Sequence, residues 1–254
     1  MKVTGERSST DAGGFNPTFQ RHRAGYALAV RFLPPGRVLD LGCGVGHSID
    51  LLQPRESVGV DRDASALEGQ PRETVVADMR ELPFADGSFA SVVSSHSIEH
   101  VPDPERVLAE AGRVLRPSGV AVFTTPNRLT FGPPDEIVDP YHYVEWDPGE
   151  LRAFCGREFA EVELYGIFGS ERYLELVAAE RRRLDSLLRL DPLRVRRLLP
   201  RRLRQLLYDW RLRAERAEAS SAAGAIEMSD FTLAEAGLEE ALDLMAVCRA
   251  PRGR

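Results

Sequence analysis

The sequence predicts an α/β fold in which a mostly parallel sheet of seven strands has helices on both faces. Short apolar segments alternate along the chain with segments of helical periodicity, which is the pattern of strands joined by helical crossovers. The length of 254 residues suffices for one sizeable domain, or for a domain with a subdomain. Because such sheets bind ligands at the carboxyl ends of their strands, functional residues are expected directly after each strand.

A helix is expected first, over residues 17–33, because Pro17 can open it and Pro34-Pro35-Gly36 ends it. Seven strands are expected over residues 37–41, 57–60, 74–77, 89–94, 120–124, 161–167 and 242–248. Helices between the strands are expected over residues 45–52, 103–115 and 148–156. Asp103-Pro104 and Asp147-Pro148 mark the starts of the last two helices, since aspartate caps a helix and proline fits its first turn.

The chain is expected to divide into four parts. An N-terminal segment and helix occupy residues 1–36, and the ligand-binding core occupies residues 37–169. A helical insert and a linker follow over residues 170–229, and a final strand within residues 230–254 completes the core. Within the insert, prolines separate two or three stretches in which leucines recur at helical spacing.

The insert carries the main shift in charge. Residues 181–216 contain thirteen arginines against four acidic residues, a net charge of +9. Each expected helix therefore has an apolar stripe and a basic face. Two interpretations remain open: a lid or homodimer surface packed on the acidic core, or a docking site for an anionic partner such as a membrane surface, a phosphorylated carrier or RNA.

Composition argues against several classes of protein. The net charge of −6 gives the chain as a whole no attraction to DNA or to anionic lipid. No apolar run approaches the ~20 residues of a membrane span, and the first residues lack the apolar core of a signal peptide. Cys43, Cys155 and Cys248 are too widely spaced for a disulfide framework or a zinc knuckle. We therefore expect a cytoplasmic protein that does not bind DNA.

A glycine-rich turn follows the first expected strand, over Gly42-Cys43-Gly44-Val45-Gly46. Glycine allows positive φ and lets a ligand approach the backbone closely. The spacing is G-x-G-x-G, and His47 stands where a dinucleotide fingerprint has its last glycine. A pyrophosphate is thus disfavoured, and the absence of a following G-K-[ST] excludes a nucleoside triphosphate loop.

Acidic residues stand at the ends of the first three strands. Asp61 ends the second strand, where a carboxylate can accept hydrogen bonds from both ribose hydroxyls. Asp78-Met79 ends the third strand and offers an acceptor for an adenine amino group and an apolar surface for its ring. Asp40, before the glycine turn, can pair with an ammonium group. Together these features suit a nucleoside that bears an amino-acid tail.

Five segments, in this order and spacing, make the chain resemble the class I S-adenosylmethionine-dependent methyltransferases, particularly their small-molecule branch. The segments are VLDLGCGVG (38–46), VGVDRD (58–63), ADM (77–79), LPFADGSFASVVSSHSIEHVPDP (82–104) and VLRPSGVAVFTTPN (114–127). The resemblance covers roughly residues 37–168 and implies a Rossmann-like fold with S-adenosylmethionine as cofactor. It implies that the cofactor-binding residues are Asp40, Gly42, Cys43, Gly44, Asp61, Arg62, Asp78, Met79, Ser95 and His96.

Candidate catalytic residues follow the fourth and fifth strands. Methyl transfer from a sulfonium is an in-line displacement, so the protein mainly orients the acceptor and controls its protonation. An acceptor hydroxyl needs a base, and histidine suits that role near neutral pH. His142, in the loop after the fifth strand, is the first candidate for base or acceptor contact, and His100 beside Glu99 is the second. Either histidine could equally orient a loop or cap a helix.

The motif His96-x-x-Glu99-His100 has the spacing of an inverted zinc-protease motif, but Pro102 and its place after a strand exclude the long helix that such a site needs. Some ubiquinone-pathway O-methyltransferases and small-RNA 2′-O-methyltransferases, which this region resembles, carry a Glu-His pair that binds a divalent ion. This chain has His96 where those families have a further glutamate. The sequence thus assigns no metal ligand and leaves metal dependence open.

The expected function is the S-adenosylmethionine-dependent methylation of a small-molecule acceptor, with oxygen favoured as the methylated atom. Two alternatives stay open: a non-catalytic binding module of the same fold, and an RNA methyltransferase that uses the arginine-rich segment. Ser94-Ser95-His96-Ser97 follows the fourth strand in place of an N-P-P-[YF] motif, which argues against methylation of base or glutamine amino groups.

Overall fold

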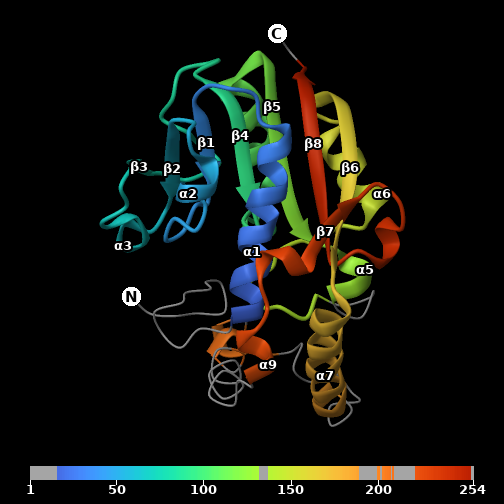
Figure 1. Ribbon diagram of the computed structural model, residues 1–254. Coiled ribbons are helices and arrows are strands. Elements are labelled where there is room, and N and C mark those ends of the chain that lie inside the picture. The colour runs from blue at the N-terminus through green and yellow to red at the C-terminus, as the bar shows by residue number, and fades with distance from the viewer. Residues whose placement is uncertain are drawn as a thin grey trace.

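The computed structural model describes residues 16–131, 137–188, 199–200, 202–206, 208 and 221–252. An eight-stranded sheet in the order β3-β2-β1-β4-β5-β8-β6-β7 forms its centre (Figure 1). The strands are β1 Val38–Leu41, β2 Ser57–Asp61, β3 Glu73–Val76, β4 Phe89–Ser95, β5 Leu115–Pro126, β6 Phe159–Gly169, β7 Phe231–Ala234 and β8 Asp243–Pro251. The predicted α/β fold is confirmed, with one strand more than expected.

The first five strands of the sheet are parallel. β1 pairs with β2 and β4, β2 with β3, and β4 with β5, all in parallel register. β8 runs antiparallel between β5 and β6, and β6 pairs antiparallel with β7. The carboxyl ends of the parallel strands therefore meet at one edge of the sheet, and the strand order reverses between β1 and β4.

The eighth strand, β7, was not expected from the sequence. It has four residues and lies at the edge of the sheet, where it pairs with the last four residues of β6. A short edge strand has only one neighbour and needs no sustained alternation of apolar and polar residues, so its sequence signal is weak.

Helices cover both faces of the sheet, and those expected near residues 17–33, 45–52, 103–115 and 148–156 are present, whereas the short helices at 64–67, 128–131 and 221–224 were not predicted. Their bounds are α1 Asn16–Ala29, α2 Ile49–Leu52, α3 Ala64–Leu67, α4 Pro104–Val114, α5 Arg128–Phe131, α6 Pro148–Cys155, α7 Glu171–Leu188 and α9 Ser221–Gly224. A 3₁₀ helix over Val30–Phe32 extends α1, so that together they match the helix expected over 17–33.

Two predicted helix bounds need correction. The helix expected over 45–52 contains only the four residues of α2, because the glycine turn continues to Ser48. The helix expected to Leu115 ends at Val114, and Leu115 already pairs with Phe89 of β4. The register then shifts before Val120, so residues 116–119 form a bulge within β5 rather than a turn that precedes it.

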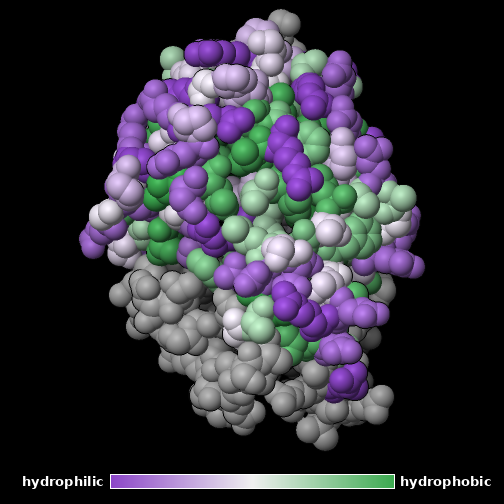
Figure 2. Space-filling view, viewed as in Figure 1, coloured by the Kyte–Doolittle hydropathy of each residue, from purple (hydrophilic) through white to green (hydrophobic). Residues whose placement is uncertain are grey.

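The sheet separates two apolar cores. Leu39 and Leu41 of β1 face α4 and α6, whereas Val38 faces α1. This alternation follows from the two-residue period of a strand, and both faces of β1 are fully buried because helices cover each side. In Figure 1, α1 crosses the front of the sheet and α6 lies behind β6. Figure 2 shows apolar residues along the middle of the α1 face, with hydrophilic residues around them.

The region between β6 and β8 is described only in part. α7 begins it, while residues 189–198 and 209–220, which carry most of the predicted arginine-rich helices, lie outside the described residues. The predicted linker over 217–229 is described from residue 221 onward, where α9 contacts α1 and Ile226 is buried in the core. Among the described helices, none combines the length and the apolar composition that crossing a membrane requires.

Candidate functional site

A cleft opens at the carboxyl ends of β1, β2, β3 and β4. It is lined by Gly42, Gly44, Asp61, Arg62, Ala77, Asp78, Met79, Arg80, His96, Ser97, His100, Val101 and Pro102. Most of the predicted cofactor-binding residues therefore line one cleft, together with the candidate catalytic residue His100. Ser97 also lines the cleft, but it belongs to the loop after β4 and no motif of its own marks it in the sequence.

The glycine turn after β1 forms one wall of the cleft. Gly42 has a φ of 68°, and a Cβ atom at this position would lie 2.5 Å from the side chain of Ser97. Ser97 Oγ donates a hydrogen bond to the Gly42 carbonyl at 3.1 Å, which holds the loop after β4 against the turn. Gly44 has a φ of 52°, but a Cβ there would meet no atom of the described residues within 4 Å. The turn thus leaves open space over Gly44, where a ligand can approach the backbone.

Two carboxylates lie at the cleft. Asp61 Oδ2 accepts a hydrogen bond from the Gly44 amide at 3.0 Å, and its Oδ1 accepts one from the Asp63 amide at 2.9 Å. Asp78 pairs with Arg80 at 2.7 Å. The Arg80 hydrogen bond lowers the pKa of Asp78 to about 2, so this carboxyl group is ionised at neutral pH. Both acids are held in place by backbone amides or a guanidinium without any ligand.

Three predicted cofactor contacts lie outside the lining of the cleft. Asp40 is fully buried, and so is Cys43, whose sulfur packs near Gly59 and whose thiol pKa is raised by burial. Ser95 is buried beside Gly25 of α1, and its hydroxyl makes no hydrogen bond with the described part of the chain. Their roles toward a cofactor stay predictions.

Asp40 is instead surrounded by donors from its own chain. Tyr26 of α1 donates its hydroxyl to Oδ1 at 2.9 Å, Arg72 donates to Oδ2 at 2.8 Å, and Ser48 also donates to Oδ2. Arg72 and Asp40 form a buried ion pair, with side chains 4% and 0% exposed. Asp40 therefore joins α1, the glycine turn and the segment before β3 beneath the cleft. Neither Tyr26 nor Arg72 carries a motif that would reveal this from the sequence.

We expect Tyr26→Phe to lower the free energy of unfolding by about 1–3 kcal/mol, because it leaves a buried carboxylate oxygen with one donor fewer. Tyr165→Phe is the matched control, since its hydroxyl bonds to Glu163 at the surface. Urea denaturation should show a change within about 0.5 kcal/mol for that control. Equal effects of the two substitutions would contradict the anchoring role of Tyr26.

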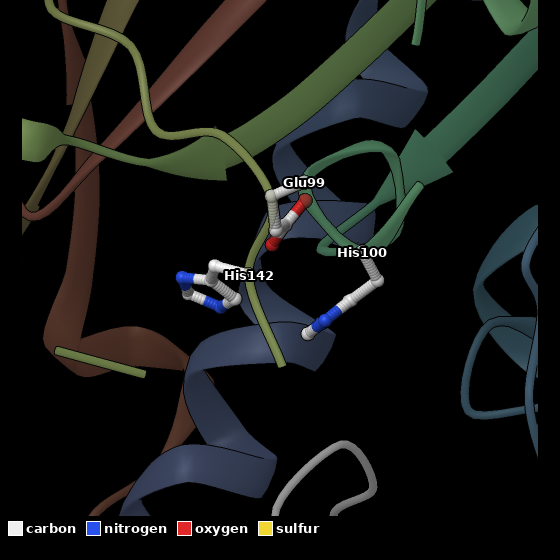
Figure 3. Close-up of side chains that lie close together, drawn as sticks. All are labelled: Glu99, His100 and His142. Atoms are coloured by element: carbon white, nitrogen blue, oxygen red, sulfur yellow. The ribbon is translucent and has the colours of Figure 1, made fainter. Parts of the chain in front are cut away.

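A second group of polar side chains lies beside the cleft. The 3₁₀ helix Ile98–His100 after β4 carries Glu99 and His100, and the loop before α6 carries His142. Figure 3 shows the three side chains pointing toward a common space from these separate segments. One possible ligand atom from each lies within 4.8 Å of the others. Of the three, only His100 lines the cleft, while Glu99 and His142 are buried behind it.

His96 connects the cleft to the helix above the sheet. It has a φ of 51°, a strained value for a residue other than glycine, and its ring stacks on His22 of α1 at 4.3 Å between centroids. Its Nε2 lies 3.5 Å from Asp243 and its Nδ1 lies 3.6 Å from Glu99. Burial would lower the pKa of His96, but these two carboxylates outweigh it and raise that pKa to about 9.

Asp243 is the shared partner beneath this site. It is fully buried at the start of β8 and accepts hydrogen bonds from the guanidinium of Arg21 in α1, with Nε at 2.7 Å. Burial opposes its ionisation, yet Arg21 and His96 hold the pKa of Asp243 well below its usual range. The sheet and its helices define a Rossmann-like α/β fold, and the imidazole groups of His96 and His100 lie at one wall of its cleft.

Comparison with known proteins identifies the family. Residues 39–123 match the model of a methyltransferase domain. A "probable S-adenosylmethionine-dependent methyltransferase" of Mycolicibacterium smegmatis is 31% identical over 263 aligned positions, which cover 99% of this chain and 96% of that protein. A protein of the same description from Mycobacterium tuberculosis strain H37Rv is 35% identical over 187 positions, covering 70% of this chain and 68% of that protein.

The fold agrees with these relatives. The crystal structure of an S-adenosylmethionine-dependent methyltransferase from Thermotoga maritima matches with a TM-score of 0.61 at 17% identity, covering 92% of this chain and 91% of that one. The chain belongs to the class I S-adenosylmethionine-dependent methyltransferases. It is an enzyme that transfers a methyl group, and its cofactor is S-adenosylmethionine.

Proposed function

We propose that this methyltransferase transfers the methyl group to a hydroxyl oxygen of a small molecule. One observation carries the proposal: the imidazole of His100 lines the cleft beside the glycine turn, with the carboxylate of Glu99 buried directly behind it. A hydroxyl must lose its proton as it attacks, and imidazole and carboxylate groups are suited to assist that loss near neutral pH. An amine acceptor, which attacks in its neutral form, has less need of such a cluster.

We further propose that the cofactor lies along the glycine turn. Its amino-acid end would lie near Gly42 and Gly44, its ribose at Asp61 with Arg62 nearby, and its adenine at Asp78 and Met79. The open space over Gly44 and the two fixed carboxylates support this arrangement. When bound, S-adenosylmethionine supplies the activated methyl group, and the protein orients the acceptor toward it.

Within the acceptor side, we propose that His100 contacts the acceptor from the cleft wall. His142 and Glu99 lie behind His100 and would not touch the acceptor themselves. They would influence it only through their contacts with His100. This revises the order of the two histidines expected from the sequence, because His100 lines the cleft while His142 is 9% exposed and outside its lining.

A small molecule is favoured over a nucleic acid as the acceptor. The chain has a net charge of −6, and the arginine-rich residues 181–216 are the one strongly basic stretch. An anionic partner or membrane surface at this stretch, a homodimer, and a cytoplasmic location stay predictions. An RNA methyltransferase remains the alternative, and membership in an enzyme family disfavours a non-catalytic module.

The test is an acceptor screen with trideuteromethyl-labelled S-adenosylmethionine, read by mass spectrometry. Phenols, alcohols, carboxylic acids, amines and RNA are offered in parallel, and nuclear magnetic resonance locates the label in any product. We expect label on the oxygen of a hydroxyl compound, at a rate that falls at least about tenfold in His100→Gln, since general-base groups contribute about 10²–10⁴-fold. Label found on amines alone, or on RNA alone, would overturn the proposal.

A further inference from the structure

Glu99, His100 and His142 bring a carboxylate and two imidazole rings to one place. One donor atom of each lies within 4.8 Å of the other two. A metal ion with ligands at about 2.0–2.2 Å holds any two donors no more than about 4.4 Å apart, so only a small closure of side chains is needed. We propose that these three residues bind one divalent transition-metal ion.

The Nδ1 atom of each histidine already has a hydrogen-bond acceptor, as in most histidines that bind metals. His142 Nδ1 lies 2.7 Å from Glu145 Oε1, and His100 Nδ1 lies 3.3 Å from the Tyr141 carbonyl oxygen. Donation through Nδ1 places the lone pair of each ring on Nε2, the form that ligates a metal. Ligating histidines characteristically donate their other nitrogen to a carboxylate or a carbonyl in this way.

Glu99 gives independent support, because it is a buried carboxylate whose oxygens point into the group. It is fully buried, and neither of its carboxylate oxygens accepts a hydrogen bond from the residues that the structure describes. His96 Nδ1 comes near at 3.6 Å, beyond hydrogen-bond distance. His96 offsets part of the cost of burying this carboxylate, but it leaves both carboxylate oxygens without a hydrogen-bond donor from the described residues. A metal ion between Glu99 and the two imidazoles would bind those oxygens directly.

A backbone hydrogen bond joins the segment that carries Glu99 and His100 to the loop that carries His142, and so helps to fix the distances between the three side chains. The amide of Tyr143, next to His142, donates to the carbonyl oxygen of Glu99 at 2.7 Å. The rings of His100 and His142 are also in edge contact, with centroids 4.9 Å apart. A backbone hydrogen bond between the ligand-bearing segments reduces the freedom that metal binding would otherwise have to remove.

The donor set indicates the class of ion. Imidazole nitrogen suits zinc, iron, cobalt or nickel, whereas magnesium and calcium prefer all-oxygen sites. Three protein ligands leave at least one position of such an ion open. Since His100 lines the cleft, the ion would lie beside the acceptor, where it could lower the pKa of a coordinated hydroxyl. This catalytic role rests on the proposed oxygen acceptor, but the binding of the ion does not.

Metal binding is tested with the tag-free full chain after treatment with a chelator and dialysis. Calorimetric titration with zinc chloride should give one ion per chain, and cobalt(II) should give a visible spectrum typical of nitrogen and oxygen ligands. We expect Glu145→Gln, which removes the negative charge of the group that orients His142, to weaken zinc binding by about 10–100-fold. Glu99→Gln and His142→Gln should weaken it further. His47→Gln, a histidine outside the group, is the matched control and should bind as the unaltered chain does.

The same preparations are titrated with S-adenosylhomocysteine to separate the two proposals. Retained S-adenosylhomocysteine binding shows that a variant is folded. If a substitution at the buried Glu99 or His142 prevents folding, His100→Gln serves instead, because His100 is partly exposed. Failure of the unaltered chain to bind zinc or cobalt, or equal zinc affinity in the unaltered chain and in folded ligand variants, would overturn the metal site. If the unaltered chain binds zinc but not S-adenosylhomocysteine, the result would instead count against the proposed cofactor cleft.

Discussion

Replacing Asp61 by alanine is expected to weaken the binding of S-adenosylhomocysteine by about 100-fold or more. The proposal gives Asp61 two hydrogen bonds to the ribose hydroxyls, and hydrogen bonds to a charged group contribute about 1.5–3 kcal/mol each. Two such bonds amount to at least about 3 kcal/mol, or two factors of ten in affinity. Asp61 also orders the glycine turn through Gly44, so the turn would lose an anchor at the same time.

The measurement is isothermal titration calorimetry of both proteins, with thermal unfolding to confirm that the variant is folded. Asp63→Ala is the matched control, because Asp63 is a neighbouring carboxylate that caps α3 and is absent from the cleft lining. It should lose about 1 kcal/mol of stability as a missing cap and retain its affinity. An Asp61→Ala protein that binds within about threefold of the unaltered chain would exclude the proposed ribose contact.

Asp243→Asn is expected to lower the free energy of unfolding by about 3–5 kcal/mol at neutral pH. The substitution removes the charge that compensates Arg21 and His96 in a buried site, and an uncompensated buried charge carries a cost of this size. Asp50→Asn is the matched control. Asp50 pairs with Arg23, which lies in α1 as Arg21 does, but the Asp50 side chain is 63% exposed. An exposed ion pair of that kind contributes only about 0–1 kcal/mol.

The effect of Asp243→Asn also has a defined pH dependence. Because the pKa of Asp243 is lowered by folding, its stabilisation is complete above the carboxyl pKa of the unfolded chain, about 3.9. It is lost as the pH falls through the lower pKa of the folded state. Urea denaturation should therefore show the full difference at pH 7 and a shrinking difference below about pH 4. A difference that stays constant down to strongly acidic pH would contradict this assignment.

Much of the fold can be predicted from the sequence because its signals are local. Strands such as 37–41 are short apolar runs that end in special residues, and helix starts such as Asp147-Pro148 carry their own capping residues, which the structure confirms as a capping box. β7 could not be predicted, because a four-residue edge strand is specified by its pairing with β6 and not by a pattern of apolar residues in its own sequence. The bulge at 116–119 likewise depends on the register against β4.

The sequence predicts those parts of the candidate site that belong to recognisable motifs at the strand ends. Gly42, Gly44 and Asp61 could be placed together because strand ends converge in a parallel sheet. The surroundings of Asp40 could not, because its donors come from α1 and from the segment before β3 and follow no spacing rule. The approach of His142 to Glu99 depends on how the loop before α6 folds back, and sequence separation alone does not reveal that distance.

The position of β8 has a consequence for the order in which the sheet can assemble. β8 lies between β5 and β6, although it follows both in the chain. During synthesis on the ribosome, β6 and β7 therefore have no place on the parallel half of the sheet until residues 243–251 have emerged. The gap between β5 and β6 must stay open until then, and its pairing depends on contacts distant in sequence, which slow folding. A strand that follows both of its neighbours in the chain thus joins the two halves of the sheet.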